Sequence, residues 1–336
     1  MPIKESVQLH FLDSIKQKIK PNISLADELA ELLEISKDSA YRRIRAEKSL
    51  DIKEVQVLAN HYNLSLDNIL NTDSDILSFR TQVIGSNDFS FSDYLNSILE
   101  KLEMITKMDD KIISYSARDL PIFHYFMLPQ LAAFKMFFWR KTYLSEQHLA
   151  DAQFDLENLP KVVEDLLPTS EQIWKSYAAI PSEELWSIET INIPLKQILY
   201  YHEAGIFNNS SHALLLIEKY DELLSIIQKE AQLGRKFIEF DNGSPSGEIF
   251  NLYYNEVSLG DNSILFKMGN KKISFLHTSI KISMTTANES FCDEMELYHN
   301  NFKKKSTLLS NTSEKQRLKL FRRIKEIIAN YKRLVA

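Results

Sequence analysis

Glycine is scarce in this chain, with 7 among 336 residues, whereas average proteins contain about 7% glycine. So few glycines argue against the glycine-rich loops that cradle phosphates, the turns that bind dinucleotides, and the many tight turns of an all-β fold. A mostly helical protein is therefore expected.

The chain also has a single cysteine, Cys292. One cysteine cannot form an intramolecular disulfide or a thiolate cage for a metal, and it fits a reducing, cytoplasmic location. The first 30 residues show no charged start followed by an apolar stretch, so no signal peptide is expected. The longest apolar segment, 123–139, is interrupted by His124, Gln130 and Lys135, so no membrane-spanning helix is expected either.

Charge is distributed unevenly, although the formal net charge is only −6. Residues 1–71 carry 10 basic and 11 acidic side chains, whereas residues 301–336 carry 11 basic and 2 acidic ones. The remainder, 72–300, holds 19 basic and 33 acidic residues. Two interpretations of the basic C-terminal segment stay open: it docks on the acidic middle of the chain, or it adds contacts to phosphates.

The first seventy residues read as a series of short amphipathic helices. Ser24, Ser36 and Asp51 are predicted N-caps, because short polar side chains accept hydrogen bonds from the first free backbone N–H groups of a helix. Glu54 completes a capping box with Asp51, and a last helical turn is predicted from Ser65. Five short helices, with two or three residues between the second and the third, are the organisation of a DNA-binding helix-turn-helix.

Apolar contacts predicted between the second and third helices support this interpretation. The apolar side chains that would hold the two helices at a steep angle are Leu29, the small Ala30, Leu33, Ile35 and Ala40. The segment ELAELLEISKDSAYRRIRAEKSL, residues 28–50, resembles helix-turn-helix domains of the Cro and phage-repressor type (XRE-like), and especially those of BetR-like regulators. The resemblance implies a five-helix, repressor-type DNA-binding head over residues 1–71, with its third helix in the major groove.

Two positions depart from the usual pattern of that family. Glu34 stands at the turn position that glycine usually occupies, which predicts a left-handed backbone at a cost of about 1 kcal/mol or more for a residue with a Cβ. Ile44 is predicted to take the buried position late in the third helix, with Arg43 beside it.

The resemblance further implies that the start and the outer face of the third helix read DNA. Arginine can form bidentate hydrogen bonds with guanine, while serine and tyrosine can reach phosphates or base edges. The segment 36–48 contains 5 basic and 2 acidic residues, which partly offsets the near-neutral charge of the head. The alternative is a small helical protein-interaction module with a solvated basic face. The predicted DNA-binding residues are Ser36, Lys37, Ser39, Tyr41, Arg42, Arg45 and Lys48.

Residues 72–110 are predicted to form a linker and a dimerisation helix. Phe91, Leu95, Ile98, Leu102 and Ile105 are spaced four, three, four and three residues apart, as in a coiled-coil seam. A homodimer would let two heads engage two half-sites on double-stranded DNA. A helix that packs on its own domain would show the same pattern.

Residues 111–336 are predicted to form an α+β regulatory or effector domain, in a chain that is mainly α overall. A strand is expected at 111–117, and strands at 249–257, 263–268 and 272–277 would form a small antiparallel sheet within a larger helical domain. Gly260-Asp261-Asn262 and Gly269-Asn270 are predicted hairpin turns. The dense aromatic stretch 123–143 is interpreted as core, with a ligand pocket as the alternative. The last helix, 313–334, is expected to be amphipathic and basic.

Patterns typical of catalysis are few. The segment GSPSG at 243–247 has proline where a nucleophile would stand, and no two of the eight histidines lie three or four residues apart. No catalytic residue, metal site or cofactor is predicted, and the chain is not expected to be an enzyme. A degenerate phosphodiesterase-like domain stays open as an alternative.

These observations together predict a DNA-binding transcriptional regulator. The stretches RDLPIFHYFMLPQLAAFKMFFW and FCDEMELYHNNFKKKSTLLS are similar to bacterial regulators in which a repressor-type head precedes a large effector domain. The head would bind operator DNA, and the C-terminal domain would dimerise and sense a signal, with an unidentified small molecule or protein as effector. The leading alternative is a non-enzymatic helical scaffold that uses the head to bind protein.

Overall fold

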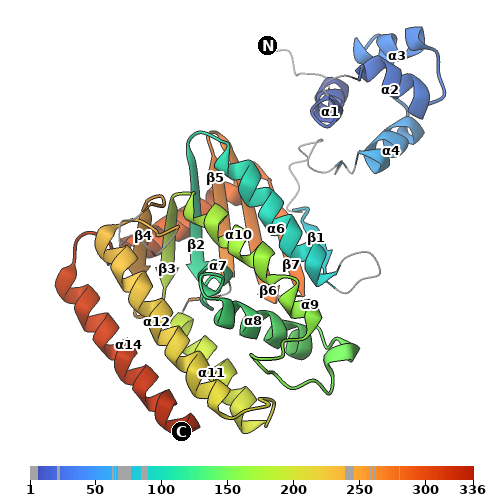
Figure 1. Cartoon of the computed structure of the whole chain (residues 1–336). Coiled ribbons are helices and arrows are strands. Elements are labelled where there is room, and N and C mark those ends of the chain that lie inside the picture. Colours follow the sequence, from blue (N-terminus) through green and yellow to red (C-terminus); the bar gives the residue numbers. More distant parts are fainter. Residues whose placement is uncertain are drawn as a thin grey trace. The chain divides into compact units, whose positions relative to one another are not determined.

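The computed structural model describes residues 7–20, 23–62, 64, 66, 77–84, 90–238, 246–257, 259–260, 262–279 and 281–336. The chain forms two compact units, Met1–Ser78, which we call the head, and Phe79–Ala336, which we call the body (Figure 1). The body combines helices with one sheet, so the α+β class expected for the C-terminal part is confirmed.

The described part of the head is helical. Its core is formed by Phe11, Ile15, Leu29, Ala40 and Leu58, which are all almost fully buried. The predicted fifth helical turn lies at 65–70, where only residue 66 is described, so the five-helix head remains a prediction. The four helices described here are α1 (Val7–Lys16), α2 (Leu25–Leu32), α3 (Lys37–Ile44) and α4 (Ile52–His61).

The predicted starts of α2, α3 and α4 are confirmed. The Ser24 hydroxyl accepts the N–H of Ala26 and begins α2, and Ser36 caps α3 in the same way. At α4, the Asp51 carboxylate accepts the N–H of Glu54 at 2.9 Å, and the Glu54 carboxylate accepts the N–H of Asp51 at 3.1 Å. These caps satisfy backbone donors that the first turn leaves free, and they set where each helix begins.

In the described part of the body, eight strands form one sheet in the order β1-β7-β6-β5-β2-β3-β4-β8. Strands β2, β3 and β4 run parallel to one another, and the other neighbouring pairs are antiparallel. The prediction of a small antiparallel sheet is therefore wrong, because helical crossovers from β2 to β3 and from β3 to β4 add a parallel half. The strands are β1 (Arg80–Val83), β2 (Lys111–Ala117), β3 (Ser182–Trp186), β4 (Phe250–Tyr254), β5 (Asn262–Met268), β6 (Lys271–Ser279), β7 (Ile282–Thr286) and β8 (Thr307–Leu308).

Of the two predicted hairpins, the one at Gly269-Asn270 is confirmed. Met268 pairs with Lys271 across these two residues, and Gly269 has a φ of 56°, a left-handed conformation that suits glycine. The hairpin predicted at 260–262 is wrong, because β4 lies between β3 and β8 while β5 lies between β2 and β6. The turn-like residues therefore connect strands that are not neighbours, and Asp261 itself lies outside the described residues.

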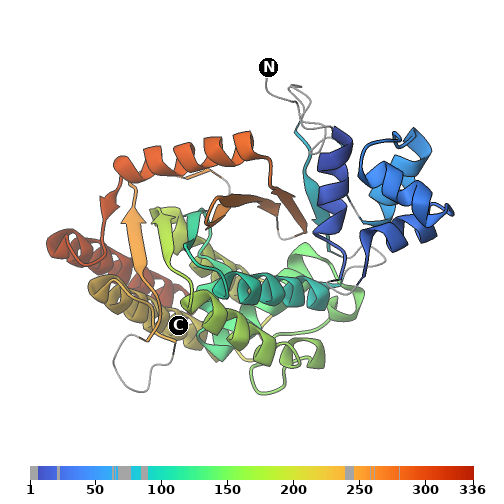
Figure 2. The ribbon, with the colours of Figure 1, turned by 90° about the horizontal axis from the view of Figure 1, so that it is seen from above.

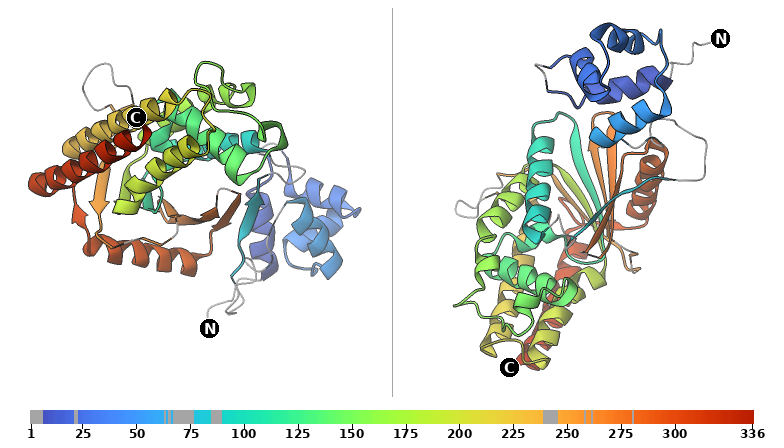
Figure 3. Two further views of the ribbon diagram at one scale, coloured as in Figure 1. Left: turned by 90° about the horizontal axis from the view of Figure 1, so that it is seen from below. Right: turned by 90° about the vertical axis from the view of Figure 1, so that its right-hand side faces the viewer.

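Helices cover both faces of the sheet. Helix α13 (Glu289–Lys304) contacts β2, β5 and β6 on one face, while the helices that lie between β1 and β4 in the chain cover the other (Figures 2 and 3). Because both faces are covered, central strands such as β2 and β5 are buried along most of their length. The covering helices are α6 (Phe91–Thr106), α7 (Ile122–Tyr125), α8 (Pro129–Phe138), α9 (Lys161–Glu164), α10 (Leu167–Ala178), α11 (Ile188–Glu203) and α12 (Ser211–Leu233), with a π-helical turn (Trp139–Tyr143) and a 3-10 turn (Gln147–Leu149).

Helix α6 uses its predicted seam inside the body. Leu95 and Leu102 are at most 1% exposed, Phe91 and Ile105 are also buried in the body core, and Ile98 packs against it. Helix α10 lies against α6. The chain's own residues cover the seam, so the structure has the alternative arrangement, a helix packed on its own domain.

The basic helix α14 (Glu314–Val335) packs against α11 and α12. Leu320, Phe321 and Ile324 on its apolar face are buried, and Lys332 forms an ion pair of 3.1 Å with Asp221 of α12. The basic residues opposite this face are exposed. The helix is thus docked by apolar contacts, and most of its positive charge lies at the surface.

The aromatic stretch 123–143 is mostly core. Phe134 packs edge-on against Phe154 and Tyr201, with ring centroids 5.6 Å apart in each pair. Lys135, which interrupts the apolar run, is fully buried, and its Nζ lies 2.7 Å from Asp119 Oδ2. None of the helices in the described part of the chain combines the length and the apolar character that crossing a bilayer requires.

Candidate nucleic-acid interface

Helix α3 has one face in the core of the head and the opposite face at the surface. Ala40 is fully buried and Arg43 is 3% exposed, whereas Tyr41 is 49% exposed and Arg42 and Arg45 are exposed. Positions 41, 42 and 45 fall on one side of a helix with 3.6 residues per turn. The structure therefore brings three of the predicted DNA-binding residues together on one exposed face.

The predicted residues at the start of α3 have other contacts as well. The Ser36 hydroxyl accepts the N–H of Ser39 at 3.3 Å, and the half-buried Ser39 offers its carbonyl to Arg43 at 3.2 Å. Lys37 is exposed, and its Nζ lies 2.6 Å from Asp27 Oδ1 of α2, which raises the pKa of the lysine. The two serines thus shape the helix start, and Lys37 is the cation available there.

The cations at the end of α3 differ in their pairing. Arg45 Nε lies 2.9 Å from Glu47 Oε1, with both side chains well exposed. Arg42 and Lys48 are exposed, and within the described residues neither side chain has an ion-pair partner. Because an exposed ion pair contributes little to stability, Lys37 and Arg45 can each release their carboxylate and bind a phosphate instead.

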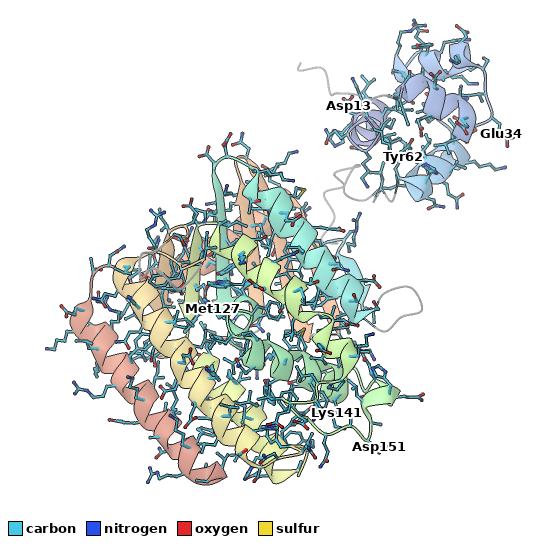
Figure 4. The ribbon with its side chains drawn as sticks, in the orientation of Figure 1. Asp13, Glu34, Tyr62, Met127, Lys141 and Asp151 are labelled. Carbon is cyan, nitrogen blue, oxygen red and sulfur yellow. The ribbon has the colours of Figure 1, made fainter. Side chains whose placement is uncertain are left out.

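The turn between α2 and α3 has the backbone predicted for it. Glu34, labelled in Figure 4, has a φ of 52° and an exposed side chain. The next residue, Ile35, donates its N–H to the carbonyl of Ala30 at 3.0 Å and so closes the end of α2. This left-handed residue sets the direction in which the chain enters α3, at the conformational cost expected for a residue with a Cβ.

The buried residue late in α3 is Arg43, so its prediction as Ile44 is wrong; Ile44 is half-buried. Arg43 Nε donates to Glu54 Oε2 at 3.0 Å, and its second nitrogen donates to Glu54 Oε1. This pairing lowers the pKa of Glu54 and raises that of Arg43. The guanidinium is buried because the first turn of α4 supplies a carboxylate, so Arg43 positions α3 rather than facing outward.

Gln8 of α1 fixes the far end of α3 and was not among the predicted site residues. Its amide nitrogen donates to the carbonyls of Arg43 and Lys48 at 2.8 Å each, and its Oε1 accepts the N–H of Leu50 at 2.8 Å. The Arg43 carbonyl also accepts the N–H of Ala46 at 3.0 Å, so Gln8 adds a second hydrogen bond there and links α1 to the end of α3. A single glutamine on a helix carries no sequence signal for such a contact.

Groups with catalytic potential in the body are tied into its core. His124 Nε2 lies 2.9 Å from both carboxylate oxygens of the buried Glu184, and His299 lies between two serine hydroxyls. Cys292 is buried, and burial raises the pKa of its thiol. Within the described ranges, no three His, Cys, Asp or Glu side chains converge in a way that could hold a metal ion.

The exposed face of α3 has the chemistry of a nucleic-acid contact. Arg42 and Arg45 can each offer a planar fork of donors to guanine or phosphate, and Tyr41 can donate to a phosphate or stack on a base. Lys37 and Lys48 stand at the two ends of the helix as point charges. Comparison of the chain with protein-family models, curated proteins and solved structures found no match.

Proposed function

We propose that the protein is a non-enzymatic, cytoplasmic transcriptional regulator whose repressor-type head binds operator DNA through α3. The observation that supports this most directly is the exposed row of Tyr41, Arg42 and Arg45 on a helix whose opposite side is buried. In this proposal the two arginines contact base edges in the major groove, while Lys37 and Lys48 contact phosphates and fix the register.

We propose further that the protein binds DNA as a homodimer. A single short helix reads only a few base pairs, and helix-turn-helix proteins gain specificity by engaging two half-sites about one helical turn apart. Because the seam of α6 is buried in the body, the dimer contact has to involve another surface. Sedimentation of the full chain with and without DNA measures this directly.

The test of DNA binding is selection of bound sequences from a random double-stranded pool with the full chain. A single enriched motif, symmetric about its centre, is the expected result. Arg42→Ala and Arg45→Ala should each weaken binding to the selected site by about 1–3 kcal/mol per lost base contact and relax one position of the motif. Lys107→Ala, which removes an exposed cation from the body, serves as the charge-matched control.

Failure to enrich a motif, or unchanged affinity in both arginine variants, would remove α3 as the recognition element. The small number of unpaired cations is the observation that favours the alternative, a head that binds protein, since Lys37 and Arg45 already face carboxylates. Salt dependence separates the two. DNA binding through Z phosphates gives a slope of about −0.9Z in a plot of log K against log salt, whereas an apolar protein contact gives a nearly flat line.

A further inference from the structure

The body contains a pocket of about 450 Å³ between one face of the sheet and the helices that cover it. Strands β2, β5, β6 and β7 supply one wall, and α6, α11 and the segment 118–123 supply much of the other. A volume of several hundred Å³ is typical of sites for small organic molecules. The pocket lies wholly within the body, so it does not depend on where the head is placed.

Much of the pocket wall is apolar and aromatic. Phe266 of β5 and Phe275 of β6 pack edge-on with ring centroids 5.1 Å apart. Leu102, Phe123 and Trp139 line the pocket from the helical side, so part of the aromatic stretch interpreted as core also faces this space. Such walls can bind the apolar part of a ligand, whether it is a ring system or an alkyl chain.

Polar groups in this wall are left without partners by the protein. Tyr94 and Tyr115 are each only 7% exposed, and among the described residues neither hydroxyl has a hydrogen-bond partner. The Nδ1 atom of His277 is likewise buried without a partner. Since buried polar groups in proteins are normally hydrogen-bonded, His277 Nδ1 marks a place where a ligand can supply a missing partner, and the two tyrosine hydroxyls in the same lining are further donors for it.

Lys101 of α6 gives the pocket a cation that no carboxylate balances. In the part of the body that is described, no carboxylate lies within ion-pair distance of its Nζ, which lies 5.6 Å from the ring centre of Phe275. Asp119, an acidic residue of the lining, is already bound to Lys135 at 2.7 Å. The pocket therefore has a surplus of positive charge.

The pKa values agree with this charge balance. Burial, and then the nearby charge of Arg80, lower the pKa of Lys101 more than the charge of Glu100 raises it. Burial and then the charge of Lys101 lower the pKa of His277 to about 4. An anion beside these two groups would favour their charged forms, because an opposite charge within a few ångströms offsets the loss of hydration.

We propose that this pocket binds a small organic acid that is otherwise apolar, and that the carboxylate group of this acid pairs with Lys101. The apolar part of the ligand packs against Phe266, Phe275 and Trp139. The hydroxyls of Tyr94 and Tyr115 donate hydrogen bonds to the oxygen atoms of the carboxylate. The lining contains one other cation, Arg118, which already has a partner, so the uncompensated Lys101 matches a single negative charge. A phosphate, with up to two charges, is less well matched because such groups are usually held by several cations or a helix N-terminus.

The experiment is calorimetric titration of the full chain with two matched pairs of probes, in the absence of DNA. The pairs are decanoate with 1-decanol, and 1-naphthylacetate with 2-(1-naphthyl)ethanol. Within each pair the acid and the alcohol differ in charge, and the two pairs differ in whether the apolar part is an alkyl chain or a ring system. At least one carboxylate should bind at least about tenfold more tightly than its alcohol, as expected for a charge-assisted hydrogen bond. The pair with the larger difference in affinity between acid and alcohol shows whether the pocket prefers an alkyl chain or a ring system.

Variants of α6 then test the role assigned to Lys101. Lys101→Met should reduce the affinity of the carboxylate to that of its alcohol, Lys101→Arg should retain the preference for the acid, and Lys107→Met on the exposed end of the same helix should change nothing. Equal binding of acid and alcohol, binding that is indifferent to Lys101→Met, or no binding of any probe would overturn the proposal. None of these outcomes depends on whether the head binds DNA.

Discussion

Arg43 and Glu54 form an ion pair that joins the end of α3 to the first turn of α4, with the arginine side chain buried and the glutamate partly exposed. The same carboxylate accepts the backbone N–H of Asp51 at 3.1 Å and so also caps α4. Glu54 therefore positions the end of α3, the helix proposed to bind DNA, and also caps the start of α4. The neighbouring Arg42 has no such contact among the described residues and points outward. Two adjacent arginines thus have different tasks.

Arg43→Met should destabilise the head by about 1–3 kcal/mol, because it leaves the partly buried Glu54 carboxylate without its charged partner. Arg42→Ala should leave stability within about 0.5 kcal/mol of the original, since an exposed side chain is removed, while weakening DNA binding. Hydrogen exchange of the amides in α2–α4 of the full chain measures the stability of the head in both variants. Adding Glu54→Gln to Arg43→Met should recover part of the loss; an additive loss would contradict the pairing.

Glu34→Gly should stabilise the head by about 1 kcal/mol, because glycine adopts a positive φ without a Cβ clash. The matched control is Glu31→Gly, an exposed position inside α2, which should destabilise by about 1 kcal/mol through the low helix propensity of glycine. Opposite signs in the same exchange measurement are the expected outcome. Equal destabilisation by both substitutions would show that Glu34 makes a contact worth more than its backbone cost.

His299 makes the stability of the body depend on pH. Its Nδ1 lies 2.9 Å from Ser114 Oγ and its Nε2 lies 2.8 Å from Ser263 Oγ. Burial, and then the charge of Lys303, lower its pKa to about 4. An unfolded chain would take up this proton near pH 6.5, so the contribution of His299 to stability should be complete above that pH and fall as the pH drops toward 4.

Urea unfolding of the full chain at pH 7, 5.5 and 4.5 tests this dependence. In His299→Gln, which keeps a donor and an acceptor but cannot titrate, the loss between pH 7 and pH 4.5 should shrink by about 2–3 kcal/mol. The remaining slope has contributions of opposite sign, because burial lowers the pKa of His277 to about 4 and raises that of Glu230 to about 8. Parallel curves for the variant and the original chain would exclude His299 as the titrating group.

Leu95→Ala should destabilise the body by about 2–5 kcal/mol without changing the oligomeric state, because its side chain is fully buried in the chain's own core. Met104→Ala on the same helix is the control, since Met104 is 47% exposed. Thermal unfolding and sedimentation of both variants measure the two quantities. A shift toward monomers in Leu95→Ala at unchanged stability would instead restore the seam as a dimer contact.

Features set by near neighbours in the chain were predictable from the sequence. The caps at Ser24, Ser36 and Asp51, the left-handed turn at Glu34 and the hairpin at Gly269-Asn270 each depend on a few adjacent residues. The seam of α6 was visible for the same reason, but the pattern could not say which surface covers it. Hydrophobic periodicity indicates that one face of a helix is buried, but it does not identify the surface that packs against this face.

Features set by distant partners could not be predicted. Arg43 looks like an exposed cation until α4 places Glu54 beside it. Strand β3 has the sequence SEELW and reads as polar, yet Glu184 is fully buried because His124, Tyr177 and Trp186 all contact its carboxylate. The pocket is harder still, because its polar groups come from separate strands and helices. Such contacts follow from the tertiary arrangement and leave no local pattern.

The pairing of β1 with β7 has a consequence for synthesis of the chain. Strand β1 begins directly after the head, but its neighbour lies at Ile282–Thr286, far toward the C-terminus. The ribosome releases every core residue of the head long before β7 emerges, a delay on the order of 10–40 s at ordinary elongation rates. A nascent chain therefore carries a finished head while its sheet still has unpaired edges, which are prone to aggregation. Translation that stops before β7 would leave the chain in that state.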